Sequence, residues 1–228
     1  MTADLFWKKR IRLIFTGVVS TAIVICALIY AWMLTNVQKI VLEQSFHFIV
    51  SESQHVEAGA HFVSQSGGAG YVMCMEDAEY VVFSVYLKGR DANKVQASLM
   101  EEGEETNVVV RCVDALYLKN ENRQKMKTIQ GAFSSLYGCI EVLQAEITRL
   151  DKGATQQSTK RVLSMLKDQF GYLKRVYRER YPAFSAVCER VETRLEKEIQ
   201  TTVFVKNLRY LQCETCVSYL KLAEEFSL

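Results

Sequence analysis

Two cysteines near the end of the chain, Cys213 and Cys216, stand in the C-x-x-C spacing that dithiol–disulfide oxidoreductases use. A redox pair needs its first thiol at a helix N-terminus, where the helix dipole stabilises the thiolate. Here the pair lies deep inside a helical pattern, beside Tyr210, Val217 and Leu220. The sequence therefore favours packing of both cysteines as small apolar side chains, with thiol–disulfide exchange as the alternative.

Other patterns that could carry chemistry are incomplete. The three histidines lie within residues 47–61 without metal-ligand spacing, and no second cysteine pair completes a zinc site. The glycine run at 67–70 leads into a strand pattern, whereas a phosphate-binding loop opens a helix. No Ser-His-Asp order or H-E-x-x-H motif occurs. We predict a noncatalytic protein without metal or cofactor, with catalysis through an unrelated spacing as the alternative.

Residues 13–34 form an uncharged stretch of 22 residues that is typical of a membrane span. As a helix it would measure about 33 Å, against about 30 Å for the hydrocarbon core of a bilayer. Four cations precede it, and only Lys39 follows before Lys88. The positive-inside rule then leaves residues 1–12 as a cytoplasmic tail. The sequence predicts a single-pass protein of the cell membrane with an extracytoplasmic C-terminal domain.

Six cysteines follow the predicted span, an even number that would permit three disulfides in an oxidising compartment. Six cysteines allow fifteen pairings, so the sequence assigns none. They are Cys74, Cys112, Cys139, Cys188, Cys213 and Cys216.

Residues 35–56 are expected to be a juxtamembrane linker, and residues 57–118 a small α+β unit. Runs rich in β-branched and aromatic residues predict strands, the first two of them paired as a hairpin. Asp91 is expected to cap the start of a helix, and Gly103 is expected to end it. The expected order is a strand at 71–75, a strand at 80–87, a helix at 91–102 and a strand at 108–113.

Residues 119–228 are expected to form a bundle of long helices or a coiled coil. Apolar residues step alternately by three and four positions from Met126 to Leu150, which is typical of a helix seam. A similar seam covers residues 163–177. A third pattern, from Phe184 to Phe226 after a proline suited to the first helical turn, contains no glycine or further proline. Three helices are predicted, of which those at 121–151 and 183–226 are candidates for homo-oligomer contacts.

The segment Glu79-Tyr-Val-Val-Phe-Ser-Val-Tyr-Leu87, followed by Asp91-Ala-Asn-Lys-Val95 and by Leu99, Gly103 and Val108, resembles the first repeat of SPOR (sporulation-related repeat) domains. The preceding glycine run, with Tyr71 and Val72, looks like the segment before that strand in SPOR-like proteins of spore-forming bacteria. The resemblance covers about residues 67–113. It implies a small α+β domain whose sheet binds septal peptidoglycan glycan strands stripped of stem peptides. The candidate glycan-binding residues are Tyr80, Ser84 and Tyr86, with ordinary sheet packing as the alternative.

Together these patterns predict an α+β chain with one transmembrane helix, a SPOR-like unit and a helical bundle. The expected function is that of a noncatalytic cell-envelope protein that binds peptidoglycan or a division or sporulation partner. The first alternative is a membrane-anchored helical scaffold that recruits another protein. With 28 Lys and Arg against 26 Asp and Glu, no general field would attract nucleic acid.

Overall fold

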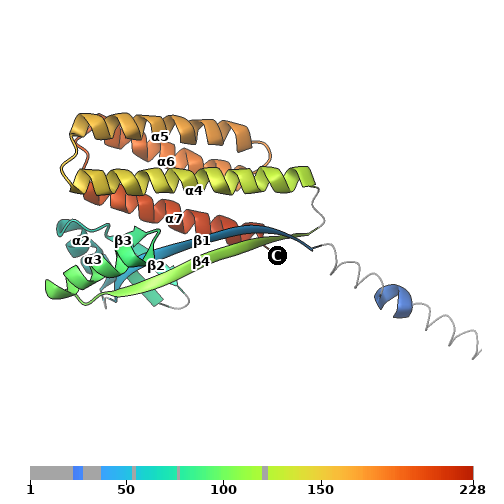
Figure 1. Cartoon of the computed structure of the whole chain (residues 1–228), viewed down its shortest axis with the longest axis horizontal. Coiled ribbons are helices and arrows are strands. Elements are labelled where there is room, and N and C mark those ends of the chain that lie inside the picture. Colours follow the sequence, from blue (N-terminus) through green and yellow to red (C-terminus); the bar gives the residue numbers. More distant parts are fainter. Residues whose placement is uncertain (1–22, 28–36, 53–54, 76–77, 120–122, 228) are drawn as a thin grey trace, which may run out of the picture.

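The computed structural model describes residues 23–27, 37–52, 55–75, 78–119 and 123–227 (Figure 1). Of the predicted membrane span at 13–34, residues 23–27 are described and are helical, and the rest lies outside the described residues. No helix within the described ranges is long and apolar enough to cross a membrane. The prediction of a single-pass membrane protein with an extracytoplasmic domain is therefore corrected: the described fold is α+β without a spanning helix.

The first half of the fold is a four-stranded sheet with the strand order β2-β3-β1-β4, in which all neighbouring strands are antiparallel. Two helices connect the strands, so that the chain order is β-α-β-β-α-β, a split βαβ arrangement. Many unrelated proteins share this topology, so it does not identify a function. The elements are β1 (Val37–Glu52), α2 (Val56–Gln65), β2 (Tyr71–Met75), β3 (Ala78–Tyr86), α3 (Gly89–Glu101) and β4 (Asn107–Lys119).

The predicted hairpin, the following helix and the last strand are confirmed as β2, β3, α3 and β4. The difference lies in residues 35–56, expected as a linker, where the structure has β1, which is 16 residues long. β1 lies between β3 and β4 and pairs with both. The first half of the split βαβ unit therefore comes from a segment that the sequence pattern left without structure.

The second half of the fold is a bundle of four helices rather than the predicted three. Its elements are α4 (Arg123–Asp151), α5 (Gln156–Tyr177), α6 (Pro182–Gln200) and α7 (Val205–Phe226). The expected third helix is divided at residues 201–204. Thr201, Thr202 and Val203 are consecutive β-branched residues, which lose side-chain freedom in a helix and favour extended backbone. The backbone of Thr201 is extended and ends α6.

The predicted seams form the centre of this bundle. Ile129, Phe133, Leu136, Ile140, Leu143 and Ile147 of α4 are buried, as are Leu163, Leu166, Phe170, Leu173 and Tyr177 of α5. Two predicted helix boundaries are confirmed: Gly103, with a left-handed φ of 92°, follows α3, and Pro182 opens α6. The predicted cap is wrong, because α3 begins at Gly89 after Lys88 and Asp91 lies in its first turn.

The sheet has a core on each of its faces. A small core lies between the sheet and the helices α2 and α3, and contains Ile49, Val63, Val81, Phe83 and Ala92. The opposite face joins the bundle in one continuous core. In Figure 1 the helical layer lies along the sheet, with α7 closest to it. The sheet unit and the bundle therefore share one hydrophobic core.

Candidate functional site

The three residues expected to bind glycan do not share an open surface. A β-bulge shifts the β1–β3 register, so that Ile49 pairs with Ser84 while Val50 pairs with Val82. Before the bulge, Tyr80 packs against the bundle core, whereas after it Tyr86 packs against the α2–α3 core. Ser84 is 5% exposed. A bulge adds one residue and breaks the strict alternation of faces on which the prediction rested.

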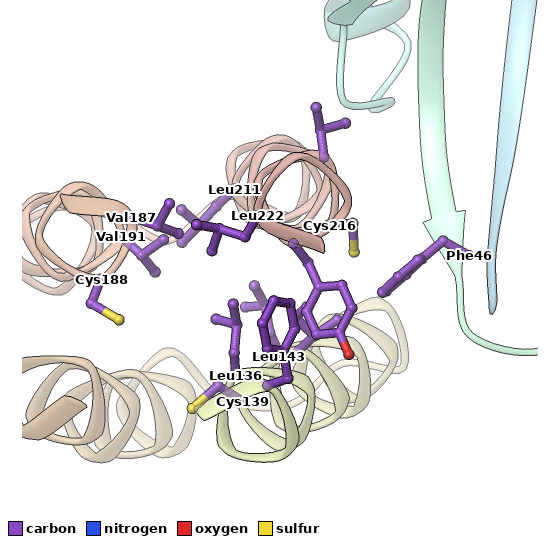
Figure 2. Packing of buried hydrophobic residues seen from close by; sticks show 14 of the residues in the cluster. Phe46, Leu136, Cys139, Leu143, Val187, Cys188, Val191, Leu211, Cys216 and Leu222 are labelled. Atoms are coloured by element: carbon purple, nitrogen blue, oxygen red, sulfur yellow. The ribbon is translucent and has the colours of Figure 1, made fainter. Parts of the chain in front are cut away.

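The sheet face toward Tyr80 is covered by the helices of the bundle. The ring of Phe46 on β1 meets the rings of Tyr219 on α7 and Tyr137 on α4, with centroid distances of 5.3 and 6.1 Å. Figure 2 shows Phe46 reaching from the sheet toward the helices. Tyr71 on β2 meets Tyr210 on α7 at 5.2 Å. A ligand on this face would therefore have to displace α7.

The C-x-x-C pair lies in the middle of α7, as predicted, and both Cys213 and Cys216 are 0% exposed. Burial raises the pKa of both thiols well above the ordinary range, which opposes formation of the thiolate. All seven cysteines are free thiols. Among the described residues, no group of three or more His, Cys, Asp or Glu side chains could hold a metal ion.

A groove of about 760 Å³ lies between α6 and α7 and reaches the end of α2 and the segment before β2. Its α6 wall follows one helix face, because residues 186, 189, 190, 193, 194, 197 and 198 recur at helical spacing. Ser64 and Ala69 bring the sheet unit into the lining. A volume of this size is typical of ligand sites. We take this α6–α7 groove as the candidate functional site.

The middle of the α6–α7 groove is fixed by an ion pair stacked on an aromatic ring. Nε of Arg194 lies 2.7 Å from Oε2 of Glu214, and the guanidinium lies 5.0 Å from the ring centroid of Tyr210. The Tyr210 ring in turn contacts Tyr71. Burial, followed by the charge of Glu214, raises the pKa of Tyr71 to about 12, so its hydroxyl keeps its proton at neutral pH.

The two ends of the groove differ in their polar contacts. At the end formed by the last turn of α6 and the first turn of α7, Nδ2 of Asn207 donates to both carboxylate oxygens of Glu198 at 3.1 Å. Lys197 and Lys206 line the same end, and neither has an ion-pair partner within the described ranges. At the other end Arg190 donates to Oγ of Ser218 at 3.5 Å. On the charged walls of the groove, Arg194 is therefore paired with a carboxylate, whereas Lys197 and Lys206 have no ion-pair partner within the described ranges.

In the sequence alone, the charges of α6 have the spacing of an ordinary solvent-exposed helix face. Arg190, Arg194, Lys197 and Glu198 recur at steps of four, three and one, which places them on one helix face together with Ala186. The partner wall on α7 could not be identified from the sequence, because the predicted third helix continued through the α6–α7 connection.

Comparison with known protein families, with curated proteins and with solved structures finds no match for this chain. The SPOR resemblance therefore stays a prediction, and we infer function from the geometry of the groove.

Proposed function

We propose that this protein is a noncatalytic scaffold that binds a partner protein in the α6–α7 groove. The observation that carries the proposal is the composition of the groove lining. The lining combines two helices of the bundle with Ser64 and Ala69 of the sheet unit. A surface built from both halves exists only in the assembled fold, as expected of a rigid recognition site.

The junction behind the groove supports rigidity. Nη1 of Arg209 on α7 donates to the carbonyl oxygen of Gly67 at 2.7 Å, and its Nη2 donates to Oδ2 of Asp151 at 2.8 Å. One side chain thus joins the α2–β2 loop, the α4–α5 turn and α7. Binding to a preformed surface costs less ordering entropy than binding to a mobile one.

Peptidoglycan binding, which the SPOR resemblance implies, receives less support than the scaffold function. The sheet face that includes Tyr80 packs against the bundle core, and Tyr86 belongs to the opposite face. The α6–α7 groove instead has Tyr210, Arg190 and Arg194 in its lining, and aromatic residues and arginine are enriched in protein–protein interfaces.

Site-specific photocrosslinking in the cells that naturally express the protein tests this proposal. A photoreactive residue at Thr193, an exposed position of the groove wall, should give one discrete adduct with another protein. The matched control is Met165 on α5, which is 72% exposed and lies outside the groove. The same adducts from both positions, or none from Thr193, would refute the scaffold function.

Sedimentation with purified sacculi distinguishes the scaffold function from the glycan-binding alternative. The scaffold proposal expects the full chain to stay in the supernatant with intact and denuded sacculi. Co-sedimentation that is lost in Tyr80→Ala with Tyr86→Ala, at unchanged circular dichroism, would replace the scaffold function by glycan binding.

A further inference from the structure

The charged side chains of the α6–α7 groove differ in whether they have a partner. Arg194 is neutralised by Glu214, and Glu198 is held by Asn207. Lys197 on one wall and Lys206 on the other have no ion-pair partner among the residues that the structure describes. Asn207 is neutral, so Glu198 keeps its negative charge, but the two lysines outnumber this one carboxylate. That end of the groove is therefore net positive, which favours a ligand with carboxylates.

Arg190 extends this positive character along α6. It lies seven residues before Lys197, two helical turns or about 10.5 Å along the axis. Its side chain makes one contact across the groove, with the neutral hydroxyl of Ser218 at 3.5 Å. Glu189 is the carboxylate at this end of the lining. The groove therefore presents cations at a two-turn spacing, with the stronger positive end at Lys197 and Lys206.

Between the charged walls, the lining contains apolar groups. Ala186 is exposed and Tyr210 is half-buried, whereas Ala69 and Leu211 are 4% and 2% exposed and belong to the core beneath the groove. The α6 wall runs from residue 186 to residue 198, about 18 Å, which matches about three turns of a further helix. A helix whose apolar stripe enters a groove is a recurrent mode of peptide recognition.

We infer that the α6–α7 groove binds an acidic amphipathic helix of a partner protein, with carboxylates two turns apart facing Arg190 and Lys197 and a further carboxylate facing Lys206. This inference rests on the proposed function and specifies the chemistry of the partner at the same site. The apolar stripe of that helix lies over Ala186 and the ring of Tyr210. The ion pair between Arg194 and Glu214 has no net charge, so it contributes to the shape of the groove wall rather than to attraction of the partner helix.

Fluorescence anisotropy with the full chain and synthetic helical peptides tests the inference. The probe is a labelled 15-residue peptide with a leucine stripe and with glutamates two turns apart on its flanks. The reference peptide has glutamine at every glutamate position. The acidic peptide should bind at least about tenfold more tightly than the glutamine peptide, and added salt should reduce the difference.

Reversing the charges of the two groove lysines tests whether the acidic peptide binds in the α6–α7 groove. Lys197→Glu with Lys206→Glu should weaken acidic-peptide binding by about tenfold or more, and should create binding of a matched lysine peptide. The control, Arg161→Glu with Arg175→Glu, makes the same charge change at exposed positions of α5 and should leave both affinities unchanged. Equal binding of the acidic and glutamine peptides, or equal losses in both double variants, would overturn the inference.

A single-stranded oligonucleotide in the same assay distinguishes general polyanion binding. If it binds the parent as tightly as the acidic peptide does and shows the same dependence on Lys197 and Lys206, the groove is an anion site and the helix assignment is wrong. Crosslinking from Thr193 separates the two proposals. A specific protein adduct without acidic-peptide binding overturns this inference alone, whereas peptide binding without an adduct overturns the scaffold function.

Discussion

Gln156, the first residue of α5, and Val203, in the connection between α6 and α7, are joined by two reciprocal hydrogen bonds. The side-chain amide of Gln156 donates to the carbonyl oxygen of Val203, and the backbone N–H of Val203 donates to Oε1 of Gln156, each at 2.9 Å. Val203 is 2% exposed, so its backbone groups need partners within the protein. The carboxamide supplies both, which explains how α6 and α7 separate without a glycine or proline between them.

Gln156→Ala should destabilise the protein by about 1–3 kcal/mol, because it leaves the backbone of a buried residue without two partners. Chemical denaturation followed by circular dichroism measures the change. The control is Gln157→Ala, the exposed next residue, which should have little effect. Equal midpoints for the two variants would show that the Gln156–Val203 bonds add nothing to stability.

Leu136→Asp or Ile140→Asp should unfold the bundle, since both residues are 0% exposed and a buried carboxylate there would lack a partner. The matched control is Val142→Asp on the same helix, where the side chain is 44% exposed and a carboxylate stays in water. Helical circular dichroism should fall strongly in the first two variants and stay near the parent value in the third. Normal thermal melting of Leu136→Asp would contradict the burial of the seam.

The local patterns of the sequence predicted α3, α4, α5 and the strands from β2 to β4, because each has its own periodicity and end signals. β1 was missed for a physical reason. Its partner β4 begins 55 residues after β1 ends, so nothing near β1 indicates the pairing. A bulge between Val41 and Gln44 also interrupts its alternation, and Glu43 has a positive φ of 52°. Long-range pairing of this kind is not visible in a local window.

The α6–α7 groove was beyond sequence reasoning because it depends on how separate elements meet. The cations of α6 have the spacing of an ordinary solvent-exposed helix face. They line a hollow only because α7 lies beside α6 and because Ala69 closes one side. On β3 the expected geometry differed for a local reason: strict alternation placed Tyr80 and Tyr86 on one face, and one bulge places them on opposite faces.

Arg209→Ala should loosen the junction between the sheet unit and the bundle, because it removes the hydrogen bonds to Gly67 and Asp151. Bonds that involve a charged group contribute about 1.5–3 kcal/mol, and this side chain is 22% exposed, so a loss of about 1 kcal/mol or more is expected. Hydrogen exchange should become faster at residues 66–70 and around the α4–α5 turn. Arg161→Ala on the exposed face of α5 should not change these rates. Unchanged exchange in Arg209→Ala would mean that the apolar core alone holds the two halves together.

The buried thiols of α4 and α6 should make the protein sensitive to alkaline pH. Burial raises the pKa of Cys139 to about 11, and burial followed by the neighbouring Cys139 raises that of Cys188 to about 12. In the unfolded chain both thiols ionise near their ordinary value of 9.0, so between about pH 9 and 11 the unfolded state releases protons that the folded state retains. The contribution of the neutral thiols is complete below pH 9 and is lost as the pH rises.

Urea midpoints measured from pH 7 to 10.5 check this expectation through their slope against pH. Cys139→Ala with Cys188→Ala should lower the midpoint at neutral pH, because two buried sulfur atoms are replaced by smaller side chains. Its decline between pH 9 and 10.5 should nevertheless be shallower than that of the parent, since the thiols that release protons on unfolding are gone. Cys112→Ala changes an exposed thiol and should follow the parent at every pH. Parallel curves for the parent and the double variant would show that Cys139 and Cys188 do not cause the alkaline loss of stability.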